Sequence, residues 1–392
     1  MNTEILNTEI QDFIAHNLTT EVSKILLKGT VFEGVSTREI IEQIEAKVKC
    51  KKKLPSWFSA ENIYFPNKLN IEQTSSEVTA NYKSQLLSGD SIIDITGGFG
   101  VDSYYFSKVF KSVTHCEINK ELSSIVTHNN KQLGVLNIKT IASDGLDYLL
   151  TSENKYDWIY VDPSRRHDSK GKVFFLNDCI PNVPNHMAAF FNKSENIAIK
   201  TSPLLDLSVG IRELKHVKTI HIIALKNEVK ELIWILNNGF KGEITIKTVD
   251  IKADKKEIFS FQLNEELQAL GTYDNPLKYL YEPNSSILKS GGFNILAKRF
   301  KLSKLHQHSH LYTSNNQIKF PGRTFKIETI INYNKKALNR LGIAKANITT
   351  RNFSETVQQL RKKHRIKDGG NTYIFFTTNY RNEKIVIVCT KV

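Results

Sequence analysis

The segment SIIDITGGFGVD, residues 91–102, constrains the fold of this chain more than any other stretch. A short apolar run ends at an acid, Asp94, and three glycines follow within four residues. Glycine adopts positive φ without a steric penalty, so Gly97, Gly98 and Gly100 let the backbone turn tightly around a bound molecule. The pattern predicts a strand that turns into a helix, with a ligand at the turn. A strand-to-helix turn without a ligand is the alternative.

The acid before the glycines indicates which ligand the turn would bind. A dinucleotide places its pyrophosphate here, and a pyrophosphate favours a helix N-terminus without a nearby carboxylate. The Asp94 carboxylate instead suits a cation or an amine, as in S-adenosylmethionine. The third glycine also follows the second by two positions and not by three. A nicotinamide-dependent oxidoreductase is therefore the disfavoured alternative.

Three further acids follow apolar runs that we expect to be strands, and they are Glu117, Asp144 and Asp162. Glu117 stands twenty positions after Gly97, where α/β nucleoside sites place a carboxylate on the ribose hydroxyls. Ligands of open α/β sheets bind at the carboxyl ends of the strands, so four acids at four strand ends predict a single site. For any one of these acids, a helix N-cap or a loop carboxylate is the alternative.

These motifs resemble those of class I S-adenosylmethionine-dependent methyltransferases. The resemblance rests on DITGGFGVD, Glu117, SDGLDYL and the DPSRR block that begins at Asp162. EQTSSEVTANYKSQLL before the first strand, and FPGRTFK, AKANITTRNF and KDGGNTYIF near the end, are similar to one bacterial branch of this family. Members of that branch carry a C-terminal THUMP-like domain. The resemblance covers about residues 71–391.

The resemblance implies S-adenosylmethionine as the cofactor and assigns a role to each motif. Asp94 and the glycines would line the methionine end of the cofactor, Glu117 the ribose and Asp144 the adenine. The complete cofactor set is Asp94, Thr96, Gly97, Gly98, Gly100, Glu117, Asp144 and Asp162. The implied catalytic set is Asp162, Pro163, Ser164 and Arg165, and Arg165 and Arg166 would face the methyl acceptor.

The DPSRR block departs from the family pattern in two positions. In the amino-methyltransferases that it resembles, an Asn or Asp and the next prolyl carbonyl accept hydrogen bonds from an exocyclic amine, as Asp162 and Pro163 could do. That pattern continues with a second proline and an aromatic residue, whereas this chain has Ser164 and Arg165. A guanidinium can stack on a base or bind a phosphate. A mechanism on a pyrimidine carbon would need a nucleophilic cysteine, for which Cys179 is the nearby candidate.

Basic residues are concentrated at the C-terminal end. The chain has a net charge of +14, and from Lys319 onward it has 16 basic but only 4 acidic residues. A basic domain joined to a nearly neutral one is typical of a nucleic-acid-binding module, and a solvated lysine-rich surface is the alternative. We expect RNA contacts at Arg361, Lys362 and Lys363.

The order of the predicted elements indicates an α/β protein of four parts. A helical unit spans residues 1–80. A class I methyltransferase domain with a doubly wound sheet and an antiparallel edge hairpin spans 81–265. A small α+β, ferredoxin-like segment spans 266–314, and the basic THUMP-like α+β domain spans 315–392.

Neither a metal nor a membrane is an expected partner. The four cysteines lack metal or disulfide spacing. The histidines of HQHSH, residues 306–310, alternate as on the polar face of a strand, which we favour over a zinc site. No apolar run approaches the length of a membrane span, and the N-terminal residues do not resemble a signal peptide. We therefore expect a cytoplasmic protein.

Together these observations predict an S-adenosylmethionine-dependent methyltransferase that acts on RNA, on a tRNA or rRNA base and through an exocyclic amine. A catalytically idle RNA-binding protein with the same fold is one alternative. A methyltransferase that acts on a protein or a small molecule is another. The sequence leaves the target base and the oligomeric state open.

Overall fold

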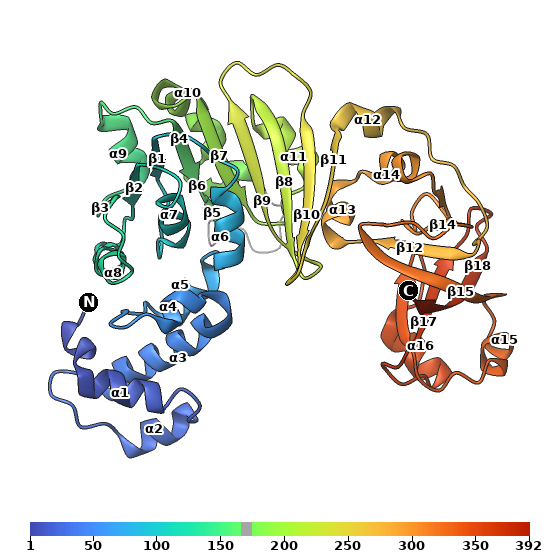
Figure 1. Ribbon diagram of the computed structural model, residues 1–392, viewed down its shortest axis with the longest axis horizontal. Coiled ribbons are helices and arrows are strands. Elements are labelled where there is room, and N and C mark those ends of the chain that lie inside the picture. The colour runs from blue at the N-terminus through green and yellow to red at the C-terminus, as the bar shows by residue number, and fades with distance from the viewer. Residues whose placement is uncertain (166–174) are drawn as a thin grey trace. The chain divides into compact units, whose positions relative to one another are not determined.

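The structure is a computed structural model that describes residues 1–165 and 175–392 (Figure 1). Its contacts divide the chain into two compact units. The first comprises Met1–Val217 and Ile233–Lys241, and the second comprises Lys218–Leu232 and Gly242–Val392.

The N-terminal part of the first unit is helical, as predicted. Its elements are η1 (Thr3–Leu6), α1 (Thr8–His16), α2 (Val22–Lys28), α3 (Thr37–Lys53), α4 (Pro55–Ser59), α5 (Lys68–Gln73) and α6 (Glu77–Ser84). Ser36 and Glu39 form a capping box that starts α3. The apolar faces of these helices form one buried core with residues of the glycine turn and the two helices that follow it. Trp57 packs there on Tyr104, with ring centroids 4.7 Å apart.

Five parallel strands form one side of the large sheet, as far as its edge: β1 (Ser91–Asp94), β2 (Ser112–Cys116), β3 (Ile138–Ile141), β4 (Trp158–Val161) and β7 (Asn196–Thr201). The helices between and after them are α7 (Val101–Phe106), α8 (Lys120–Gln132), α9 (Gly145–Thr151), α10 (Val183–Lys193) and α11 (Leu207–Glu213). β1 pairs with β2 on one side and with β4 on the other. The strand order therefore reverses at β1, which places the ligand crevice at the carboxyl ends of β1 and its neighbours.

The sheet continues through the predicted hairpin, β8 (Val217–Leu225) and β9 (Glu228–Asn237), and through β10 (Thr245–Ile251) and β11 (Lys256–Gln262). The complete order is β11-β10-β8-β9-β7-β4-β1-β2-β3. Lys226 and Asn227 have φ values of 52° and 65°, which a two-residue type I′ hairpin turn requires. The hairpin inserts β9 as an antiparallel strand between β8 and β7.

The second unit contains a seven-stranded sheet with the order β13-β14-β12-β15-β18-β17-β16. Its strands are β12 (Tyr279–Pro283), β13 (Ser303–Lys304), β14 (Tyr312–Ser314), β15 (Gly322–Asn332), β16 (Asn347–Arg351), β17 (Thr372–Thr378) and β18 (Lys384–Lys391). Its helices are α12 (Leu263–Gln268), α13 (Ser285–Ser290), α14 (Phe293–Phe300), α15 (Lys335–Arg340) and α16 (Val357–His364). Because β12 pairs with β15, the two C-terminal parts expected from the sequence share one sheet.

The prediction of a strand over HQHSH is wrong. β13 ends at Lys304 and β14 begins at Tyr312, so the histidines lie in the turn between them. Asn352 and Asn382, which are distant in sequence, hydrogen-bond the ring of His306, and these tertiary contacts stabilise the turn. No group of three metal-ligating side chains occurs among the residues that the structure describes. Over the same residues, no helix is long and apolar enough to cross a membrane.

Candidate active site

The glycine turn joins β1 to α7 and separates a packed side from an open side. Gly98 and Gly100 have φ values of 53° and 77°. A Cβ atom added to Gly97 would lie 2.2 Å from Nε2 of the buried His115, so this glycine lets the turn pack against β2. A Cβ added to Gly98 would meet no atom within 4 Å. The turn is therefore closed toward the sheet, while Gly98 borders space that a ligand can fill.

Asp94 ends β1 beneath this turn and is only 1% exposed. Its carboxylate accepts hydrogen bonds from Thr96 N at 3.0 Å and from Ser103 Oγ at 2.9 Å. Burial raises the pKa of Asp94 to about 7, and the carboxylates of Asp102 and Asp162 add to the rise. A cationic group bound beside Asp94 would favour its ionised form.

A second buried carboxylate, Asp102, lies near Asp94 and was not anticipated as part of the site. It accepts hydrogen bonds from Ser75 Oγ and Tyr160 OH, each at 2.9 Å, and Lys83 Nζ lies 2.9 Å from its Oδ1. Burial opposes the ionisation of Asp102, but the ammonium groups of Lys83 and Lys200 outweigh burial and hold its pKa below the usual value. Ser75 and Lys83 belong to the EQTSSEVTANYK motif, so this network links that motif to the glycine turn.

Glu117 and Asp144 follow β2 and β3 at the same edge of the sheet. Glu117 is the residue predicted to bind the ribose, and its Oε2 accepts a hydrogen bond from Gly98 N at 2.9 Å. This bond joins Glu117 directly to the glycine turn. Asp144 is the N-cap of α9, and its Oδ1 accepts hydrogen bonds from Leu146 N and Asp147 N. The alternative interpretation of Asp144 as a helix cap is thus correct for one oxygen, Oδ1.

Asp162 follows β4 and forms an ion pair with Lys200 of β7. The Asp162 side chain is 34% exposed and the Lys200 side chain is 12% exposed, so the lysine is the more deeply placed partner. Asp162 N donates a hydrogen bond of 2.6 Å to Thr96 Oγ1. This bond fixes the start of the DPSRR block to the glycine turn. Lys200 is a candidate site residue that the sequence alone did not indicate, although it stands near the end of β7.

The rest of the DPSRR block enters a small two-stranded sheet of β5 (Ser164–Arg165) and β6 (Cys179–Ile180). Pro163 is buried and Ser164 is exposed. Cys179 pairs with Arg165 across this ladder, but it is completely buried and donates its thiol to Phe175 O. Burial of this thiol argues against the cysteine mechanism. The side chain of Arg165 and all of Arg166 lie outside the described residues.

The three residues predicted to contact RNA differ in their local bonding. Arg361 donates hydrogen bonds to Ala346 O and Ile366 O and forms an ion pair with Asp368. It therefore stabilises the local structure of its own domain. Lys363 forms an ion pair with Glu355. Lys362 is exposed.

Comparison with known proteins agrees with this architecture. A solved structure of a candidate methyltransferase from Porphyromonas gingivalis W83 is 29% identical, aligns over 100% of this chain and 98% of its own, and has a TM-score of 0.88. This chain has a class I methyltransferase fold.

A ferredoxin-like domain and a THUMP-like domain follow the methyltransferase fold. Residues 279–321 match the model of a ferredoxin-like domain, and residues 322–391 match that of a THUMP domain-like family. These matches confirm that the C-terminal part contains the two expected types of domain, one ferredoxin-like and one THUMP-like. No curated protein matches the chain.

Two solved structures align with a smaller share of the chain. A candidate methyltransferase from Streptococcus mutans in complex with S-adenosylhomocysteine is 15% identical, and it aligns over 41% of this chain and 97% of its own with a TM-score of 0.30. An rRNA methylase from Streptococcus thermophilus is 14% identical, and it aligns over 41% of this chain and 94% of its own, also with a TM-score of 0.30.

Proposed function

We propose that this protein is an S-adenosylmethionine-dependent methyltransferase that acts on RNA. The observation that carries the proposal is the convergence of Asp94, Glu117 and Asp162 on the glycine turn. Asp94 and Asp162 are each hydrogen-bonded to Thr96, and Glu117 is hydrogen-bonded to Gly98. Acids from three different strand ends thus meet at one loop, in the crevice where open α/β sheets bind nucleosides.

The residues at the turn suit this cofactor. When bound, S-adenosylmethionine supplies an electrophilic methyl group on a sulfonium. Gly98 borders open space, and a ligand that carries positive charge would favour the ionised form of the buried Asp94, whose pKa is raised to about 7. Glu117 is the residue that would hold the ribose hydroxyls. Asp144 would accept a hydrogen bond from the adenine amine through the oxygen that does not cap α9.

The Asp162–Lys200 pair supports a role for Asp162 toward the methyl acceptor. Lys200 pairs with the Asp162 carboxylate, and a carboxylate only accepts hydrogen bonds. A carboxylate and the adjacent prolyl carbonyl of Pro163 can therefore accept both protons of an exocyclic amine and direct its lone pair. Methyl transfer depends mainly on such alignment. Because Asp162 N is hydrogen-bonded to Thr96, Asp162 would hold the acceptor at a fixed position relative to the glycine turn.

The C-terminal domain supports RNA as the substrate. It is THUMP-like, and the segment from Lys319 onward has 16 basic and 4 acidic residues. Such a charge excess attracts the phosphate backbone of a nucleic acid. The cytoplasmic location expected from the sequence remains a prediction of the same proposal.

Calorimetry with S-adenosylhomocysteine tests the cofactor part of this proposal. The full chain should bind it with a Kd in the micromolar range, about −8 kcal/mol, and should not bind NADH. Glu117→Ala should weaken binding by about 1.5 to 3 kcal/mol, because the ribose hydroxyls would lose the carboxylate that accepts their hydrogen bonds. Glu153→Ala, at an exposed position before β4, is the matched control and should bind like the wild type. Equal affinity of the two variants would contradict the site.

A further inference from the structure

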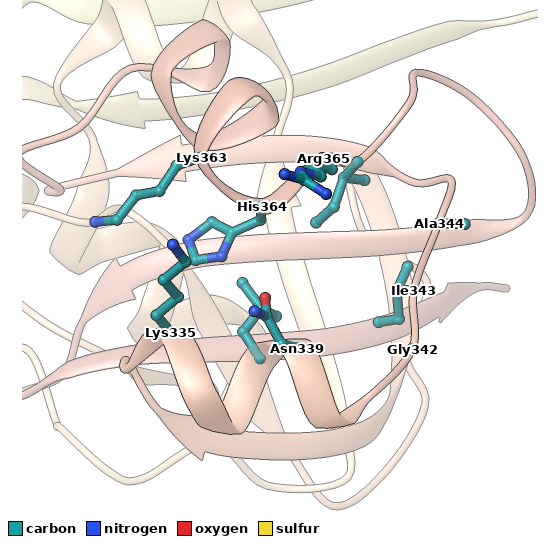
Figure 2. Close-up of a pocket in the computed structure, with 10 residues that line it drawn as sticks. Lys335, Asn339, Gly342, Ile343, Ala344, Lys363, His364 and Arg365 are labelled. Atoms are coloured by element: carbon teal, nitrogen blue, oxygen red, sulfur yellow. The ribbon is translucent and has the colours of Figure 1, made fainter.

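The THUMP-like domain contains a pocket of about 480 Å³ between α15 and the end of α16 (Figure 2). This volume lies within the range of sites that bind small molecules, about 300 to 1,000 Å³. The polar side chains around it are those of Lys335, Asn339, Lys363, His364 and Arg365. The pocket belongs to the second unit alone, so it does not depend on the site at the glycine turn.

The pocket contains more cationic residues than the dipoles of its two helices stabilise. Basic residues in the last turn of α16, such as Lys363, are stabilised by the helix dipole. Lys335 stands instead in the first turn of α15, where the dipole disfavours a cation and no acidic residue compensates. Neither Lys335 nor Arg365 has an acidic partner among the described residues. An anion in the pocket would balance both charges.

His364 is a buried polar residue that lines the same pocket. It is 9% exposed, its Nε2 lies 3.3 Å from Tyr333 OH, and its Nδ1 has no hydrogen-bond partner among the described residues. Burial, followed by the charge of Lys363, lowers the pKa of His364 and keeps the ring neutral. A buried polar atom without a partner is costly, so a ligand that hydrogen-bonds it gains affinity.

The remaining walls are apolar and distinguish this pocket from a simple phosphate site. Leu338, Ile343 and Ile366 line it beside the cations, and the exposed amide of Asn339 projects from α15. A nucleobase offers a flat apolar face together with hydrogen-bonding edges. Cations next to an apolar wall and one amide therefore match a phosphate that is joined to a base.

We propose that this pocket binds one nucleotide of a single-stranded segment of the RNA substrate. Lys335 and Arg365 contact its phosphate, while Ile343 and Asn339 contact its base. This inference rests on the proposed function, because it takes RNA as the substrate. It adds a position at which the substrate is held away from the methyl-transfer chemistry.

Fluorescence anisotropy of the full chain with a fluorescein-labelled, mixed-sequence, single-stranded RNA tests the pocket. The double variant Lys335→Gln/Arg365→Gln should bind the RNA at least tenfold more weakly. Its log-log salt slope should be shallower by about 0.7 to 1.4, which corresponds to one or two phosphates. The matched control Lys319→Gln/Lys391→Gln removes the same charge at exposed positions outside the pocket. It should change the affinity less than threefold.

Two further arms separate a nucleotide pocket from general electrostatics. Asn339→Ala removes no charge, so it should weaken binding about threefold to fivefold while the salt slope stays that of the wild type. Adenosine monophosphate should displace the RNA only at concentrations far above those of the RNA itself, because a single nucleotide lacks the contacts of the rest of the chain. Displacement at similar concentrations would assign the pocket to a free nucleotide and overturn the inference.

The inference and the proposed function fail in different ways. Equal loss of RNA affinity in the pocket variant and in the charge-matched control would overturn the pocket, even if the wild type methylates RNA. Pocket-dependent RNA binding without methyl transfer would support the pocket and contradict the proposed reaction. A wild-type chain that binds no RNA at any salt concentration would contradict both.

Discussion

Asp94 is the residue whose chemistry depends most on its surroundings. In the folded chain burial raises its pKa to about 7, so the folded state binds a proton that the unfolded chain releases. The free energy of unfolding therefore falls as the pH rises from about 4 to about 7. The site thus keeps a carboxylate at the expense of stability, which is a common property of functional residues.

Asp94→Asn should make the protein more stable and less selective for a cationic ligand. At pH 8 its Tm should exceed that of the wild type, because the variant has no buried carboxylate to ionise. In the wild type, the affinity for S-adenosylmethionine relative to S-adenosylhomocysteine, which lacks the sulfonium charge, should rise from pH 6 to pH 8, by up to about tenfold per unit below pH 7. In the variant this ratio should not change with pH. A pH-independent ratio in the wild type, measured by calorimetry, would contradict the placement of the cation beside Asp94.

Lys200 is expected to act as a positioning residue through Asp162. Lys200→Met removes one lysine from the neighbourhood of three carboxylates, those of Asp94, Asp102 and Asp162. It should lower the rate of methyl transfer at least tenfold, which corresponds to about 1.4 kcal/mol of activation free energy. Lys200→Arg keeps the charge and should recover most of the rate. Initial rates with labelled cofactor provide the measurement. If the methionine and arginine variants are equally slow, the positive charge of Lys200 does not explain its effect on the rate.

At this scale the sequence identified the acids but not their partners. Asp94, Glu117, Asp144 and Asp162 each close or follow an apolar run, and such a pattern can be recognised along the chain. Lys200 approaches Asp162, and Lys83 approaches Asp102, only after the chain folds, since each lysine is distant from its partner in sequence. The position of Lys200 near the end of β7 could have drawn attention to it by the same strand-end rule.

At the scale of elements, the glycine turn has two faces with different requirements. A methyl group at Gly97 would clash with His115, whereas one at Gly98 would enter open space. Gly97 therefore serves the packing of the turn against β2, and we expect Gly98 to serve the ligand. The turn itself was predictable from the sequence, but this division was not, because it depends on where His115 lies.

Substitutions at these glycines should separate stability from binding. Gly97→Ala should lower the Tm markedly, because the turn must move away from His115. Gly98→Ala should cost about 1 kcal/mol of stability through its positive φ, yet lose most of the affinity for S-adenosylhomocysteine. Gly134→Ala, with a φ of 71° and open space around its Cβ, is the matched control and should lose stability only. Full affinity in Gly98→Ala would show that the ligand does not approach this glycine.

Strands were predicted more accurately than polar turns. The apolar run that ends at Asp94 was expected as a strand and is β1, because a buried parallel strand reads as a continuous apolar run. HQHSH has the alternation of a strand but forms a turn, in which His306 hydrogen-bonds with Asn352 and Asn382 from distant segments of the chain. Alternation of polar residues alone did not reveal those tertiary contacts.

At the scale of the whole molecule, the separation of charge and chemistry was visible in the sequence. The basic residues gather in the THUMP-like domain, and the acids of the site gather in the methyltransferase fold. The sharing of one sheet by the ferredoxin-like and THUMP-like parts was not visible, because the pairing of β12 with β15 joins segments that the sequence pattern treats as separate.

RNA binding by the full chain should depend strongly on salt. Each single-strand phosphate that the basic domain neutralises should contribute about −0.7 to the log-log slope, so affinity should fall steeply between about 50 and 200 mM salt. Anisotropy titrations at several salt concentrations provide this slope. A slope near zero would mean that the basic residues form only a solvated surface.

The central claim, methyl transfer from S-adenosylmethionine to RNA, is tested most directly by incubating the full chain with bulk bacterial RNA and methyl-labelled cofactor, followed by nucleoside analysis. The wild type should label one nucleoside, on an exocyclic amine. Asp162→Ala should lose this activity but keep its affinity for S-adenosylhomocysteine, because Asp162 is proposed to orient the acceptor. A wild-type chain that binds the cofactor and the RNA but labels no nucleoside would contradict the account.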